Sequence, residues 1–167
     1  MLFCKLNELS NESDVEQKFL LPILTSAQPR GLGYATSDFH TKSSIKKIEI
    51  DKGKSKKLYF PDYIIVNGGL PLIILEAKSP GEDLGEALRE ARLYATEINA
   101  QFAHDVNPCA KIIVTNGTEL ISADWDSSSP INHLSFSEID VTLSKYVDFV
   151  NEFSKVNILQ ISEKILK

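Results

Sequence analysis

The sequence has 167 residues, 43% hydrophobic and 25% charged, the proportions of an ordinary globular protein with one sizeable core. Its formal net charge of −5 argues against a protein that grips DNA by bulk positive charge. We expect a single domain over residues 1–167, with its core at about 10–125. No long apolar run and no signal-peptide pattern is present, so we expect no membrane partner and a cytoplasmic location. Cys4 and Cys109 have no metal-ligand spacing, and no disulfide is expected between them in a reducing compartment.

Residues 10–26 predict the first helix, because apolar side chains recur there at helical spacing. Ser10 or Ser13 can cap this helix, and Glu16 follows Ser13 at the spacing of a capping box. Pro22 carries no N–H to donate, so we expect the helix to break or restart there.

A lysine-rich segment follows a loop at residues 28–33. Ile45, Ile48 and Ile50 indicate an edge strand, and residues 51–55 indicate a turn. The lysines of this segment are Lys42, Lys46, Lys47, Lys52, Lys54, Lys56 and Lys57. Two interpretations stay open: a basic patch for nucleic acid, or a solvated hairpin whose charges protect a sheet edge.

The stretch PDYIIVNGGLPLIILEAK, residues 61–78, predicts two strands joined by a tight turn. Residues 58–66 are β-branched and aromatic enough for a strand, and Asn67-Gly68-Gly69 tolerates the positive φ of a hairpin turn. Residues 70–77 are almost continuously apolar, as in a strand buried on both faces.

Three charged groups interrupt this apolar hairpin: Asp62, Glu76 and Lys78. A buried carboxylate is costly unless it is paired or binds a metal. Glu76 and Lys78 are two residues apart, so on a strand they point to the same face, and the hairpin can bring Asp62 alongside. Two carboxylates of this kind suit Mg²⁺, which prefers oxygen ligands.

The remaining elements predict a sheet covered by helices. Asp83 caps a helix that runs to about Asn99, and strands follow at 111–115 and 119–125, joined by an Asn-Gly turn. A closing helical segment is expected at about 137–167, with an apolar side of Ile139, Leu143, Tyr146, Val147, Val150 and Phe153. His40, His104 and His133 lie in polar surroundings and are expected at the surface.

Pro61-Asp62 followed by Glu76-Ala77-Lys78 resembles the PD-(D/E)XK nuclease motif. The stretch as a whole resembles the N-terminal nuclease domain of type I restriction enzyme restriction subunits, and the resemblance covers about residues 10–125. It implies an α/β, restriction-endonuclease-like fold with an αβββαβ core, in which a mixed central sheet is flanked by helices.

The resemblance also implies the chemistry and the partners. It implies that this chain hydrolyses DNA phosphodiester bonds with Mg²⁺, for which Mn²⁺ can substitute. Asp62 and Glu76 would hold the metal and Lys78 would be catalytic. Motor, methyltransferase and specificity subunits would be partners. A non-catalytic DNA-binding or scaffold protein that kept the nuclease fold is the alternative.

Two further positions match the family in the first helix and in the helix after Lys78. Glu16 matches a Glu that approaches the metal site, although a capping role stays open. Tyr94 matches the Tyr of a Gln-x-x-x-Tyr signature, in which Glu90 replaces the Gln, so this pair is expected near DNA or else as core and surface residues. Among the lysines we expect Lys54, Lys56 and Lys57 to bind DNA.

Overall fold

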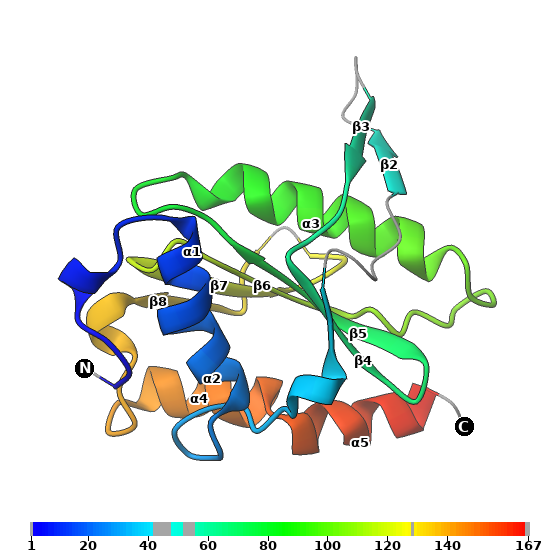
Figure 1. Cartoon of the computed structure of the whole chain (residues 1–167). Coiled ribbons are helices and arrows are strands. Elements are labelled where there is room, and N and C mark those ends of the chain that lie inside the picture. The colour runs from blue at the N-terminus through cyan, green and yellow to red at the C-terminus, as the bar shows by residue number, and fades with distance from the viewer. Residues whose placement is uncertain (1, 42–47, 52–55, 128, 166–167) are drawn as a thin grey trace.

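A mixed six-stranded sheet forms the centre of the computed structural model, which describes residues 2–41, 48–51, 56–127 and 129–165. In spatial order its strands are β1 (Phe39–Thr41), β4 (Tyr63–Asn67), β5 (Leu70–Ala77), β6 (Lys111–Thr115), β7 (Glu119–Asp124) and β8 (Asn132–Ser135). β5 and β6 are parallel and the other neighbours are antiparallel. β2 (Ile48–Asp51) and β3 (Lys56–Tyr59) form a separate antiparallel ribbon that projects from the body (Figure 1).

Helices cover both faces of the sheet (Figure 1). α3 (Leu84–Asn99) connects the parallel strands β5 and β6 and packs on one face. The opposite face is covered by the N-terminal helix and by two C-terminal helices. These are the continuous run α1 (Glu12–Asp14), η2 (Val15–Leu20) and α2 (Leu21–Thr25), then α4 (Ser144–Phe153) and α5 (Lys155–Ile165). Three single 3₁₀ turns are η1 (Leu6–Glu8), η3 (Thr36–Asp38) and η4 (Phe136–Glu138).

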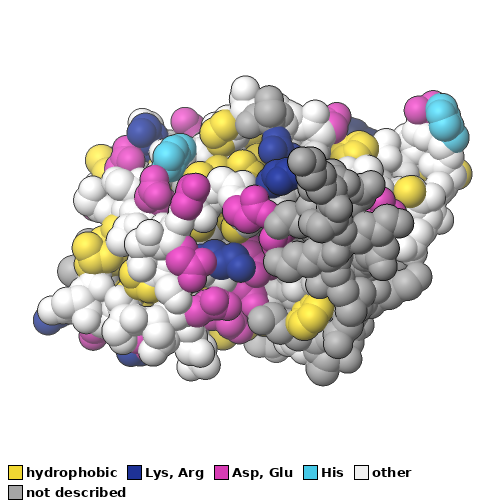
Figure 2. Space-filling view, turned by 90° about the horizontal axis from the view of Figure 1, so that it is seen from above, with side chains coloured by type: hydrophobic (Ala, Val, Ile, Leu, Met, Phe, Trp, Pro, Cys, Tyr) yellow, Lys and Arg dark blue, Asp and Glu magenta, His cyan; other side chains and the backbone are white. Residues whose placement is uncertain are grey.

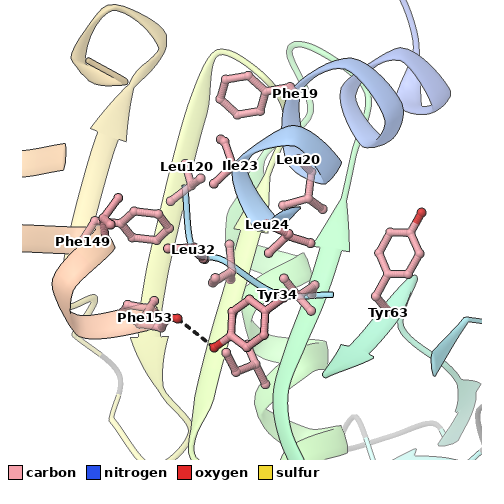
Figure 3. Close-up of a cluster of buried hydrophobic side chains, with 14 of the residues drawn as sticks. Phe19, Leu20, Ile23, Leu24, Leu32, Tyr34, Tyr63, Leu120, Phe149 and Phe153 are labelled. Carbon is pink, nitrogen blue, oxygen red and sulfur yellow. Dashed lines mark hydrogen bonds between the residues drawn. The ribbon is translucent and has the colours of Figure 1, made fainter. Parts of the chain in front are cut away.

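The alternation of side chains along the strands divides the core into two clusters, one on each face of the sheet. Ile64, Ile74 and Ile112 face α3. Ile65, Ile73 and Ile113 face the N-terminal and C-terminal helices. In the second cluster the Tyr34 hydroxyl donates to the Phe153 carbonyl over 2.8 Å, which ties the N-terminal region to α4 (Figure 3).

The first helix differs in detail from the sequence prediction. It begins at Glu12, and the cap is Asn11, whose side chain accepts from the Asp14 N–H over 2.8 Å, so the prediction of a Ser10 or Ser13 cap was wrong. No break occurs at Pro22. The π-helical turn η2 precedes it, with the Leu21 N–H donating to the Glu16 carbonyl five residues back, so a change of winding accommodates the proline.

The prediction of one strand over residues 58–66 was also wrong. The chain bends after β3 and enters the main sheet only at β4. Pro61 has no N–H for the ladder, and this bend brings Asp62 to the first position before β4. The strand at 70–77, the helix capped by Asp83 and the strand at 111–115 are confirmed. Ile45 and most of the predicted 51–55 turn lie outside the described residues.

The closing helix begins at Ser144 rather than Ser137, because β8 and η4 come first. Leu143 and Val147 are exposed, unlike the rest of the predicted apolar side. His40, His104 and His133 are exposed, as expected, and Cys4 and Cys109 are free thiols. Among the described residues, no helix has the length and apolar character needed to cross a membrane.

Candidate active site

Asp62 and Glu76 lie side by side at the ends of β4 and β5. Tyr63 pairs with Leu75 in the antiparallel ladder, so Asp62 comes opposite Glu76. The backbone N–H of Asp62 donates to Glu76 Oε2 over 3.3 Å, and Asp62 Oδ2 accepts from the Ala77 N–H over 2.8 Å. Both acids are buried, with 2% and 4% of their surface exposed. The hairpin therefore holds two carboxylates in a fixed relation, as the sequence predicted.

Lys78 completes this group at the end of β5. Its Nζ lies 3.4 Å from Glu76 Oε1, and its backbone N–H donates to the Thr115 carbonyl over 2.8 Å, which extends the parallel pairing of β5 with β6. Burial lowers the pKa of Lys78, but the negative charges of Glu76, Glu12 and Asp62 outweigh it and raise that pKa above its ordinary value. Lys78 is thus a cation held among carboxylates.

The carboxylate of Glu16 accepts a hydrogen bond from the Tyr63 hydroxyl. The structure therefore assigns the Glu16 side chain to a tertiary contact between the first helix and β4, and the expected capping box with Ser13 is not formed. Tyr63 was not singled out from the sequence, because nothing in the local pattern indicates a partner 47 positions away.

Glu12 is a second acid of the first helix, and the sequence analysis missed it. It lies one helical turn before Glu16, so the two side chains share a face of the first helix. The negative charge of Glu12 acts on Lys78. The spacing of four residues between Glu12 and Glu16 was the signal that could have placed both acids on one face of the helix. In Figure 2, acidic side chains gather around basic ones on the face seen from above.

Glu90 and Tyr94 both occupy the buried face of α3, with 4% and 0% exposed. The alternative that Glu90 is a surface residue is therefore wrong. Tyr94 packs in the α3-side cluster with Ile74 and Val114, and burial raises the pKa of its hydroxyl to about 12. Lys54 and the side chains of Lys56 and Lys57 lie outside the described residues.

The donor set at the hairpin fits a hard divalent cation. Asp62 and Glu76 supply carboxylate oxygens, and Mg²⁺ is commonly held by one or two carboxylates together with water and substrate phosphate. Within the described ranges, no group of three or more His, Cys, Asp or Glu side chains is arranged to hold a metal. A site built on these residues would therefore use two protein carboxylates.

A comparison with known families identifies the family of the part of the chain that contains this hairpin. The family model of the type I restriction enzyme R protein N terminus matches residues 43–125. This part of the chain belongs to that family. The matched range of the R protein N-terminal family includes Asp62, Glu76 and Lys78, together with Glu90 and Tyr94 of α3. The first helix precedes it. Searches of curated proteins and of solved structures gave no match.

Proposed function

We propose that this domain hydrolyses DNA phosphodiester bonds with Mg²⁺, as the nuclease part of a type I restriction–modification system. The observation that supports this proposal is the pair of buried carboxylates Asp62 and Glu76, followed by Lys78. Glu76 accepts from the Asp62 N–H and Asp62 accepts from the Ala77 N–H. A structural role alone gives no reason to bury two acids side by side, since the desolvation cost must be offset. Membership of the R protein N-terminal family supports the same interpretation.

The element order supports the finer proposal of a restriction-endonuclease-like fold. The first helix is followed by β1, β4, β5, α3 and β6 in the main sheet, which is the expected αβββαβ order with the β2–β3 ribbon inserted after β1. In this arrangement the candidate site lies where β5 leaves the sheet for α3.

Each residue of the group has a role in the proposed reaction. Asp62 and Glu76 would hold the metal, and Mn²⁺ can take the place of Mg²⁺. When bound, the metal supplies neutralisation of phosphate charge and a lower pKa for the attacking water. Lys78 would orient that water or stabilise the negative charge that develops on the phosphate. Its contact with Glu76 over 3.4 Å keeps the ammonium beside the carboxylates before DNA arrives.

DNA contact outside the cleavage centre is proposed for the lysine-rich segment. Between residues 42 and 57 the sequence has Lys42, Lys46, Lys47, Lys52, Lys54, Lys56 and Lys57. Lys56 and Lys57 belong to β3, which ends three residues before Asp62. Replacing both by Gln should weaken DNA binding and reduce its salt dependence. The exposed Lys145 and Lys164, replaced in the same way, provide a control with the same change of charge.

The proposed partners follow from the family. We propose motor, methyltransferase and specificity subunits of a restriction–modification complex as partners of the domain, because the matched family is the N terminus of a type I restriction enzyme R protein. The domain alone is then expected to be a weak nuclease with little sequence preference, since recognition and translocation come from the partners.

The test is cleavage of supercoiled plasmid by the purified chain. We expect slow nicking with Mg²⁺ or Mn²⁺, no nicking with EDTA and no response to ATP. Lys78→Ala should abolish nicking while the protein stays folded, as its circular dichroism spectrum would show. Lys145→Ala, at an exposed lysine paired with Glu138, is the matched control and should cleave like the wild type. Equal cleavage by the wild type and Lys78→Ala would contradict the proposal.

The alternative of a DNA-binding scaffold without catalysis predicts a different pattern. The wild type would then bind DNA but would not nick it with either metal. Lys78→Ala would change only the affinity for DNA. The buried Asp62–Glu76 pair favours the nuclease, because a scaffold has no use for two desolvated carboxylates.

A further inference from the structure

The side chain of Asn116 holds together the turn between β6 and β7. Its Oδ1 accepts from the Thr118 N–H over 3.0 Å, from the Thr118 hydroxyl over 2.8 Å and from the Glu119 N–H over 2.9 Å. Thr115 braces the same turn, because its hydroxyl donates to the Glu119 carbonyl over 2.6 Å. Asn116 is 2% exposed and Thr115 is fully buried. The turn therefore has a fixed conformation at the end of β6.

The same asparagine also contacts the segment that follows Lys78. Asn116 Nδ2 donates to the Glu82 carbonyl over 2.7 Å. Residues 79–82 form a tight turn, in which the Glu82 N–H donates to the Ser79 carbonyl over 3.1 Å. One side chain thus ties the β6–β7 turn to the connection between Lys78 and α3. Figure 1 shows the β6–β7 turn and the start of α3 at the same end of the sheet.

Lys78 lies opposite Asn116 across the two parallel strands. The register pairs Ala77 with Thr115, the last residues of β5 and β6. The Lys78 N–H continues this ladder by donating to the Thr115 carbonyl over 2.8 Å. The backbone of Lys78 is therefore bonded to the residue directly before Asn116, and the chain after Lys78 is bonded to Asn116 itself.

Asn116 and Lys78 also belong to the same face of the sheet as Glu76. Val114 packs in the α3-side cluster and pairs with Glu76 in the parallel register. Because side chains alternate along a strand, Asn116 and Lys78, two positions further on, lie on that face as well. The bond from Asn116 to Glu82 agrees with this placement, since Glu82 leads into α3.

We infer that Asn116 is a positioning residue for Lys78. By holding the Glu82 carbonyl it fixes the path of residues 79–82, and with it the direction in which Lys78 leaves the end of β5. This inference rests on the proposed function, in which the Lys78 ammonium acts on the attacking water or on the phosphate. Asn116 acts only through the backbone. A displacement of about 1 Å in a catalytic group can slow a reaction about a hundredfold.

The test compares two measurements on the purified chain: nicking of supercoiled plasmid at saturating Mn²⁺, and Mn²⁺ affinity by isothermal titration calorimetry without DNA. Asn116→Ser keeps a hydroxyl that can accept from the N–H groups of the turn but is too short to reach the Glu82 carbonyl. We expect nicking to slow about tenfold or more, because Lys78 is displaced. The Mn²⁺ affinity should stay unchanged, because Asp62 and Glu76 keep their own backbone contacts.

Asn99→Ser is the matched control. Asn99 is a second buried asparagine, 3% exposed, whose Nδ2 donates to the Cys109 carbonyl over 3.0 Å and whose Oδ1 accepts from the Cys109 N–H over 2.9 Å. It is the last residue of α3, whereas Glu82 precedes the first. Urea unfolding measures the stability that each variant loses. Asn99→Ser should nick like the wild type, and an equal slowing there would show that lost stability is the cause and overturn the inference.

Asn116→Asp is the second variant, for the case that Asn116→Ser does not fold by circular dichroism. It keeps the shape of the side chain and the acceptor of the turn but loses the donor to Glu82. It should also nick slowly. Nicking at the wild-type rate in a folded Asn116 variant, or a loss of Mn²⁺ affinity in Asn116→Ser, would overturn the inference while the proposed function stands. A wild type that neither binds Mn²⁺ nor nicks DNA would overturn both.

Discussion

The backbone N–H of Asp62 lies 3.3 Å from a carboxylate oxygen of Glu76 and donates a hydrogen bond to it. The backbone of one acid thus orients the carboxylate of the other. The Asp62 carboxylate is oriented in turn by the Ala77 N–H, which donates to Asp62 Oδ2 over 2.8 Å. Backbone donors orient both carboxylates before any ligand arrives. They do not remove the repulsion between two buried negative charges, which Lys78 offsets only in part.

Metal binding should therefore stabilise the folded domain. A divalent ion that binds only the folded state adds RT ln(1 + [L]/Kd), roughly 2.7 kcal/mol at a hundredfold excess over Kd. We expect Mn²⁺ or Mg²⁺ to raise the melting temperature of the wild type in differential scanning fluorimetry. Asp62→Asn should be at least as stable as the metal-free wild type, because the repulsion is gone, and should lose most of the metal response.

The control for this prediction is Asp148→Asn, at an exposed acid on α4, which should keep the full metal response. If the shift in melting temperature survives in both Asp62→Asn and Glu76→Gln, the ion binds elsewhere and the assignment of the hairpin fails.

Glu90→Gln tests whether the buried acid of α3 belongs to the DNA-binding site. The two side chains have the same shape, but Gln has no negative charge to repel phosphate. We expect tighter DNA binding in fluorescence anisotropy. Glu97→Gln, at an exposed position of the same helix, should be silent in binding and change stability by no more than about 0.5 kcal/mol. An unchanged DNA affinity and cleavage rate in Glu90→Gln would remove Glu90 from the site.

Asp38 should make stability depend on pH in the acid range. This 5% exposed carboxylate accepts from Lys155 Nζ over 2.8 Å and from the Ala35 N–H over 2.9 Å. Burial raises its pKa, but these bonds outweigh burial and lower the pKa below its ordinary value. The unfolded chain then binds the proton more readily, so the contribution of Asp38 is present above about pH 4 and is lost as pH falls through the lower, folded pKa.

Urea unfolding from pH 7 to pH 3 measures this effect. Asp38→Asn should cost about 1–3 kcal/mol at pH 7 because Lys155 loses its partner. The gap between the two proteins should narrow as the pH drops below 4. A gap that stays constant down to pH 3 would show that the Asp38 charge contributes nothing.

Gly117→Ala should be more harmful than a glycine replacement at an open turn. Gly117 has φ +85°, and an added Cβ would lie 2.8 Å from Leu9 Cδ1 and 3.2 Å from Val15 Cγ2. Gly68 has φ +60° and no atom within 4 Å of such a Cβ. Both changes carry the backbone cost of positive φ, about 1–2 kcal/mol, and only Gly117→Ala adds a clash.

Denaturant unfolding of the two glycine variants compares the two costs directly. We expect Gly117→Ala to lose at least about 1 kcal/mol more than Gly68→Ala. Equal losses would show that the turn after β6 is not pressed against the start of the first helix.

The candidate hairpin was predictable because its signals are local. Asn67-Gly68-Gly69 fixes the turn, and the distance along each strand then brings Asp62 opposite Glu76. The helix after Lys78 was predictable for the same reason, since Asp83 caps it and its apolar spacing is regular.

The contacts that surround the hairpin were not predictable from local patterns. Ser13 and Glu16 have capping-box spacing, yet Asn11 caps the helix and Glu16 bonds to Tyr63. This tertiary contact depends on how the helix crosses the sheet, which a single sequence does not reveal. β8 was missed because its four residues carry no strong alternation, and Pro61 interrupted an otherwise strand-like run.

The core between the sheet and the N-terminal and C-terminal helices has a practical consequence for anyone who shortens this protein. Most of the buried side chains there come from before residue 43 or after residue 125, among them Phe19, Leu20 and Phe149. A fragment cut to the family-matched range would keep Asp62, Glu76 and Lys78 but leave one side of the sheet bare. Such a fragment should aggregate on expression, so the smallest unit worth producing begins before the first helix and runs through α5.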